Sequence, residues 1–133
     1  MNDVRGGKHR GAVTLILVCL AASALAQFSG VRSKVELVGA KRPAKPPNCE
    51  MEIFGENKPE KRYEVVARID VYVRRNKITQ GRQATYEEAA PELKKQACKA
   101  GADAVIVLRQ TVSSSGEFKV LYVKAEAIHF TND

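Results

Sequence analysis

Alternating apolar and polar positions predict two strands in the middle of the chain. In residues 49–54, Cys49, Met51 and Ile53 alternate with glutamates, which is typical of a half-buried strand. Residues 62–74 keep the same period of two for longer. The positions that share their apolar face are Tyr63, Val65, Ala67, Ile69, Val71 and Val73. An alternation this long predicts an antiparallel sheet with one buried face and one wetter face.

The apolar spacing changes to that of a helix over residues 85–100. The narrow apolar stripe consists of Ala90, Leu93, Ala97 and Ala100. Thr85 followed by Glu88 fits a capping box, and Gly101 suits the left-handed position that ends a helix. Pro91 conflicts with one straight helix. The helix therefore either begins near Pro91 or is kinked there, and we favour a short N-terminal turn followed by the main helix.

Two further strands are predicted after this helix. Residues 103–110 are almost continuously apolar, which predicts a central strand buried on both faces. Residues 113–116 (SSSG) predict a turn, and residues 117–130 alternate again as a last strand. The resulting order β-β-α-β-β, in which two hairpins flank one helix, predicts an α+β fold: a mainly antiparallel sheet with one helix packed on one face.

The first 26 residues have the pattern of an export signal. Basic residues precede an apolar run over residues 11–20, and Ala24-Leu25-Ala26 fits an A-x-A cleavage site before Gln27. The run is shorter than the roughly 20 residues of a membrane span. We expect a signal peptide at 1–26 with cleavage between Ala26 and Gln27, and a periplasmic or secreted protein of the bacterial cell envelope.

Residues 27–48 have the composition of a linker. They contain the run KRPAKPP at residues 41–47, in which prolines and basic residues favour an extended, solvated segment. A short strand at residues 34–38 is a weaker alternative for part of it. We expect a Pro-rich basic tether at 27–48 and the α+β domain at 49–133.

Three cysteines are present, and their positions imply different fates. Cys19 lies in the leader's apolar run, whereas Cys49 and Cys98 remain after cleavage. Two cysteines in an oxidising compartment predict a Cys49–Cys98 disulfide, with free thiols or a metal or redox role as alternatives. Lipid anchoring through Cys19 is a minor alternative, because the preceding Val18 is larger than the small residue that a lipobox requires.

The charge of the chain indicates the kind of partner. The 133 residues carry a net charge of +7, which suits an anionic envelope surface or another envelope protein and permits peripheral or tethered membrane association. Nucleic acid is not expected, because no recognition motif is present. Arg74, Arg75, Lys77 and Arg82 could form a patch for an anionic partner, with a solvated loop as the simpler interpretation. The oligomeric state is left open.

Catalytic chemistry has little support in this sequence. No phosphate-binding loop is present, and His129 is the one histidine after the leader. A metal site would need Cys49, Cys98 and His129, which lack the close ligand spacing of structural zinc sites. We therefore expect no enzyme activity and no cofactor. Metal binding is the alternative function, and a small hydrolase is a second alternative.

The junction between the helix and the following strand resembles a known group of small bacterial domains. Residues 93–107 read LKKQACKAGADAVIV, and this pattern is similar to YbjQ-like domains, described as heavy-metal-binding, and to RcsF-like domains of envelope-stress sensor lipoproteins. The resemblance covers about residues 49–130. It implies a β-β-α-β-β fold and an exported, non-enzymatic envelope module for binding, sensing or structure. RcsF-like domains are lipidated and carry two disulfides, and this chain departs from both features.

Overall fold

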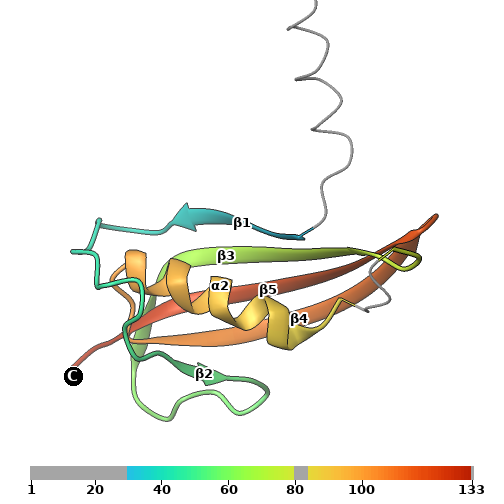
Figure 1. Ribbon diagram of the computed structural model, residues 1–133. Helices are drawn as coiled ribbons and strands as arrows, with labels where there is room; N and C mark the ends of the chain where they lie inside the picture. Colours follow the sequence, from blue (N-terminus) through green and yellow to red (C-terminus); the bar gives the residue numbers. More distant parts are fainter. Residues whose placement is uncertain (1–29, 80–83, 133) are drawn as a thin grey trace, which may run out of the picture.

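The strands form one five-stranded sheet in the order β1-β3-β5-β4-β2, and one helix lies across one of its faces (Figure 1). The computed structural model describes residues 30–79 and 84–132. The elements are β1 (Gly30–Leu37), β2 (Glu52–Phe54), β3 (Tyr63–Asn76), α2 (Tyr86–Lys99), β4 (Ala104–Ser115) and β5 (Phe118–Phe130). The expected signal peptide, its cleavage site and Cys19 lie outside the described residues. Within these residues, no helix is long and apolar enough to cross a membrane.

The main core lies between α2 and the sheet, which confirms the predicted α+β class. Side chains alternate across a strand, so every second residue of β3 and β5 faces the helix. The fully buried side chains on this side include Ile69, Val71, Val73, Leu93, Val105 and Val123. Small residues of α2, such as Ala89 and Ala97, let the helix approach the sheet closely.

A β-bulge in β3 divides the core in two. The pairing of β3 with β5 shifts between Val65 and Ala67, so Tyr63 and Val65 face away from α2. There they pack with Ile106 and Ile128 in a small second cluster. The prediction that all alternate residues from Tyr63 share one face therefore holds only from Ala67 onward, because the extra residue of a bulge reverses the alternation.

The segment expected as a tether is part of the domain. Gly30–Leu37 forms β1, which pairs with β3 in antiparallel register along its whole length. Ser33 of β1 also donates a hydrogen bond to Glu92 of α2 at 2.7 Å. After β1, the Pro-rich run passes over the end of α2, where the backbone N–H of Lys45 donates to the carbonyl of Cys98 at 2.8 Å. The prolines extend the chain here, but its contacts fix it in place.

The strand predicted at residues 49–54 is shorter than expected and occupies the opposite edge of the sheet. Only Glu52–Phe54 form β2, and they pair with β4 in parallel register. Of the two hairpins expected from the element order, the second, β4–β5, is confirmed, whereas the first is wrong because β2 does not pair with β3 in the described part of the chain. The Cys49–Cys98 disulfide holds the start of this segment beside the end of α2, from which the chain can reach β4.

β4 is buried on both faces only at its beginning. Ala104, Val105 and Ile106 are buried, whereas the strand from Leu108 to Ser115 is exposed. The central strands are instead β3 and β5. The serines predicted as a turn belong to β4, and Gly116, with φ of 58°, makes the turn.

α2 continues through Pro91 as one helix. Glu88 of its first turn accepts a hydrogen bond from the Thr85 backbone N–H at 3.3 Å and pairs with Arg75 of β3 at 3.2 Å. These contacts anchor the first turn, which offsets the backbone hydrogen bond that Pro91 cannot donate.

Gly101 is the position where a side chain is least tolerated. Its φ is +72°, and a Cβ atom there would overlap the carbonyl oxygen of Pro43. We expect Gly101→Ala to destabilise the protein by roughly 3 kcal/mol or more, combining backbone strain with steric overlap. Gly116→Ala is the matched control, because Gly116 has φ of +58° but open space around it. The control should cost about 1 kcal/mol; equal losses in urea unfolding would contradict the steric argument.

Candidate functional site

The face of the sheet opposite α2, here called the open face, carries the most distinctive set of side chains. Its polar part is formed by alternate residues of β1, β3, β5 and β4. One cross-strand row consists of Lys34, Asp70, Lys124 and Arg109. The neighbouring row consists of Arg32, Tyr72, Tyr122 and Thr111. The two rows place tyrosines at the centre of the sheet and cations on both sides of them.

The tyrosines belong to the two central strands and contact each other. The ring centroids of Tyr72 and Tyr122 are 5.0 Å apart, with a tilted arrangement. The hydroxyl of Tyr122 donates a hydrogen bond to Asp70 at 2.8 Å. Tyr72 remains 41% exposed, so an aromatic ring with a polar tip is accessible to a ligand at the middle of the face.

Three cations on the open face make no hydrogen bond or ion pair with the described residues. Asp70 lies between Lys34 and Lys124 in the row, but its hydrogen bond comes from Tyr122. Glu36 pairs with Arg68 at 3.7 Å, and Glu126 lies opposite Arg68 in the sheet. Lys34, Lys124 and Arg109 are exposed, and none of them makes a hydrogen bond or ion pair within the part of the chain that the structure describes. We call these three residues the cationic row. Strands are about 4.8 Å apart, so Lys124 and Arg109 on neighbouring strands can reach one anionic group together.

The patch predicted after the second strand is divided between two faces. Arg74 lies on the open face, over the Phe118 ring at 3.9 Å. Arg75 points to the other side and pairs with Glu88 of α2. Lys77 lies in the loop after β3, and Arg82 lies outside the described residues. Adjacent residues of a strand face opposite ways, so Arg74 and Arg75 do not form a single patch.

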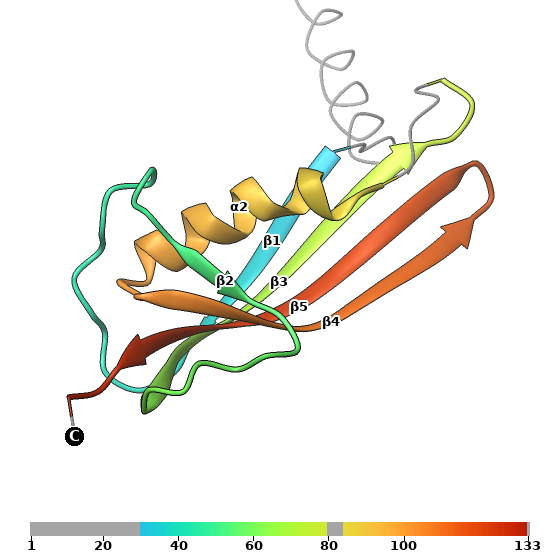
Figure 2. The same ribbon diagram turned by 90° about the horizontal axis from the view of Figure 1, so that it is seen from below.

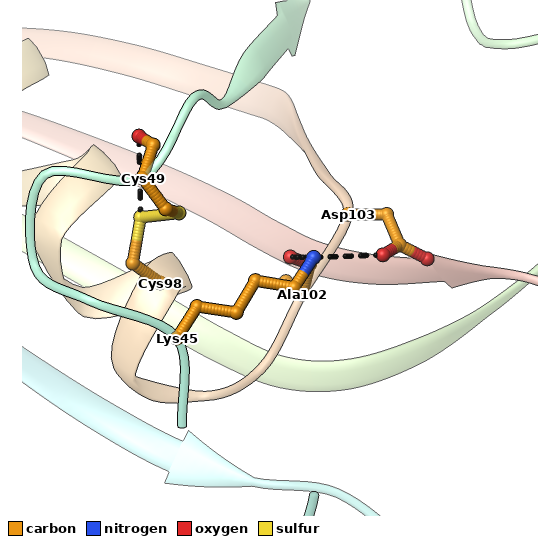
Figure 3. Close-up of a disulfide and its surroundings, with 5 residues drawn as sticks. All are labelled: Lys45, Cys49, Cys98, Ala102 and Asp103. Atoms are coloured by element: carbon orange, nitrogen blue, oxygen red, sulfur yellow. Dashed lines mark hydrogen bonds and ion pairs between the residues drawn. A yellow bond between two sulfur atoms is a disulfide. The ribbon is translucent and has the colours of Figure 1, made fainter. Parts of the chain in front are cut away.

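A second polar cluster surrounds Asp103 at the junction of α2 and β4 (Figure 3). One oxygen of Asp103 accepts from Lys45 at 2.9 Å, and the other lies 2.6 Å from Nδ1 of His129. The backbone N–H of Phe130 donates to the second oxygen at 3.0 Å. In the described structure no hydroxyl or thiol contacts the remaining nitrogen of His129, so the cluster lacks the nucleophile that an Asp–His catalytic arrangement requires.

The predicted disulfide is present beside this cluster. Cys49 and Cys98 are joined, with their Cα atoms 6.0 Å apart (Figure 3). Their sulfurs are bonded to each other, so they are not available as thiolates to coordinate a metal. His129 contacts Asp103 instead, and the described residues contain no group of three side chains that could hold a metal ion. The alternative site of Cys49, Cys98 and His129 therefore does not form in the oxidised protein.

Comparison with known proteins supports the fold alone. Neither a family model nor a curated protein sequence matches this chain. Among solved structures, the chain is similar to one titled "Crystal structure of a Francisella virulence factor FvfA in the orthorhombic form", with a TM-score of 0.55 and 11% sequence identity. The match covers 73% of this chain and 96% of that chain. At this identity the similarity shows a shared fold alone.

Asp103 should make stability depend on acid pH. Partial burial alone would raise its pKa, but hydrogen bonds from Lys45, Phe130 and His129 outweigh burial and lower the pKa of this carboxyl. The unfolded chain therefore takes up the proton first, so the contribution is complete above about pH 4 and is lost as pH falls through the folded-state pKa. Asp103→Asn should lower the free energy of unfolding at neutral pH and flatten its decline in acid. Glu56→Gln, in an exposed loop, is the control and should change neither.

Tyr122 should titrate abnormally late. Its hydrogen bond to Asp70, followed by partial burial, raises its pKa to about 12. Asp70→Asn should bring this pKa back toward about 10, measured as tyrosinate absorbance, and Tyr122→Phe identifies the transition. Glu36→Gln removes an acid from the same face without touching Tyr122. If it lowers the pKa equally, a general charge effect explains the shift and the hydrogen bond does not.

Proposed function

We propose that this chain is an exported, non-enzymatic binding module of the cell envelope whose open face engages an anionic partner. The observation that carries the proposal is the cationic row beside the tyrosine pair, of which Tyr72 is exposed. These side chains lie on the two central strands and their neighbours, a rigid platform that positions charged groups without a loop rearrangement. This role agrees with the RcsF-like resemblance of residues 93–107, which remains part of the proposal.

The disulfide supports the assignment to an oxidising compartment. Disulfides persist in secreted and periplasmic proteins and are rare in the cytosol. The Cys49–Cys98 bridge closes a long segment, with a sequence separation of 49, and such a bridge typically stabilises by roughly 2–4 kcal/mol. A fold that depends on this bridge suits the compartment to which the leader-like sequence at 1–26 would direct it.

The spacing of the cationic row favours a polymer over a small anion. Lys124 and Arg109 lie on neighbouring strands, whereas Lys34 lies two strands from Lys124, about 10 Å away. One carboxylate or phosphate can contact the first two, and a repeated anionic group is needed to reach the third. An acidic polysaccharide or a phosphate-bearing surface chain of the envelope provides such a repeat, and Tyr72 adds a flat ring for contact beside the charges.

The triple variant Lys34→Gln/Lys124→Gln/Arg109→Gln tests this proposal. At low salt, calorimetry should show binding of the wild type to polygalacturonate or inorganic polyphosphate. The variant should bind roughly tenfold more weakly or worse, since each cation near an anionic surface contributes on the order of 1 kcal/mol. Binding should also decline with added salt, because exposed charges are screened. The two probes separate a preference for carboxylate from one for phosphate.

The matched control changes the same amount of charge on the helix side. Lys94, Lys95 and Lys99 are exposed on α2, and their triple replacement by Gln should leave most of the binding intact. Equal losses in both triple variants would show that net charge alone drives binding and would overturn the role of the open face. Unfolding curves of both variants confirm that neither has lost the fold.

A further inference from the structure

The outer edge of β4 is unpaired along most of its length. β2 pairs with β4 only from Ala104 to Ile106. Beyond that point, no strand in the described part of the chain pairs with the outer side of residues 107–115, and β4 runs on alone at the margin of the sheet (Figure 2). Unpaired N–H and C=O groups in such a row are a template for another strand.

Beyond Arg109, this edge lacks the charges that normally prevent edge pairing. From Gln110 to Ser115 the sequence is QTVSSS, without a charged residue or a proline. Val112 is 55% exposed within it. The opposite edge, β1, carries Arg32, Lys34 and Glu36, and charged side chains, lysine above all, are a common protection of edge strands. One edge of the sheet is therefore protected and the other is not.

The unprotected edge is complementary to itself. When two copies of β4 are placed antiparallel and centred on Ser113, Thr111 lies opposite Ser115 and Val112 lies opposite Ser114. The same register brings Arg109 of each copy to the turn of the other at residues 116–117, which carries Glu117. Neither side chain has an ion-pair partner within the described residues. The pairing thus places opposite charges together at both ends and like charges nowhere.

A groove beside the edge gives room for the approaching turn. Its volume is about 380 Å³, and its lining includes Leu108, Arg109, Gln110 and Tyr86. In the register centred on Ser113, the turn of the second copy at Gly116 lies opposite Gln110, at the margin of this groove. The edge and the groove can therefore be filled by the same partner.

We propose that the chain forms a symmetric dimer through antiparallel pairing of β4 with β4 of a second copy. The interface is isologous, as a twofold axis requires, and it joins two five-stranded sheets into one continuous sheet. Both helices stay on one side, so the two open faces become continuous on the other. This inference does not depend on the anionic partner, because it rests on the edge and the anion site rests on the face.

Sedimentation velocity of the oxidised full-length protein over a wide concentration range tests the dimer. The wild type should associate reversibly. Ser113→Lys places two lysines opposite each other and should weaken association by about tenfold or more, whereas Ser113→Thr should retain it. Arg109→Glu and Glu117→Arg should each weaken association, and the double variant Arg109→Glu/Glu117→Arg should restore it, because the pair is re-formed with reversed sign.

Cysteine cross-linking tests the register independently. Ser113→Cys faces itself across the axis and should give a covalent dimer on mild oxidation. Thr111→Cys faces Ser115 and should not. A monomer at all concentrations, or cross-linking at residue 111 in place of 113, would overturn the proposal. Association that is insensitive to Ser113→Lys would also overturn it, by placing the interface elsewhere. Because Arg109 lies in the cationic row, anion binding is measured at protein concentrations at which sedimentation shows the monomer, so that failure of one proposal is distinguishable from failure of the other.

Discussion

The contacts at the junction of α2 and β4 hold the Pro-rich segment against the end of the helix. Gly101 reverses the chain there with a positive φ, and the Pro-rich segment crosses directly above it. Lys45 donates to the carbonyl of Ala102 at 2.8 Å and to Asp103 at 2.9 Å, while the disulfide joins the same segment to Cys98. The Lys45–Asp103 pair is partly exposed and contributes little alone. The arrangement depends on the covalent bridge, the close packing over Gly101 and the ring of donors around Asp103 acting at one place.

This junction affects which strands form the two edges of the sheet and how much of β4 stays unpaired. The segment crossing it begins at β1 on one edge and continues into β2 on the other, so it encircles the end of the helix. The bridge holds Cys49 near the helix end, five residues lie between it and Gly55, and three of these pair with β4. The unpaired length of β4 is thus a consequence of where the segment is attached, and the charge-free sequence QTVSSS leaves that length available.

Features set by local pattern could be predicted from the sequence, and features set by register could not. The alternation of β5 and of β3 from Ala67 onward, the glycine stop after α2 and the Cys49–Cys98 bridge were predicted from spacing or from the expected compartment, and the structure confirms them. The predictions of a tether at 27–48 and of a first hairpin were wrong, because tertiary contacts determine which strands pair and composition does not reveal them. Lys34, Lys124 and Arg109 come from three separate segments, and they form a row only through the pairing of four strands. Arg74 and Arg75 were predicted as part of one patch because they are adjacent in the chain. In a strand, adjacent side chains point to opposite faces, so the two residues are separated.

The two faces of the sheet have different roles: the face under α2 forms the core, and the open face carries the charged side chains that we propose for binding. On the helix side, Ile69, Val71 and Val123 are fully buried, so substitutions there affect the core. The acids of the open face, Glu36, Asp70 and Glu126, are outnumbered by its cations, which leaves a surplus of positive charge. The cations are Arg32, Lys34, Arg68, Arg74, Arg109 and Lys124. Exposed cations that no acid neutralises repel one another and weaken the folded state slightly. A partner that supplies negative charge relieves that repulsion, so the same surplus that costs stability in the isolated domain gives the open face its capacity to bind.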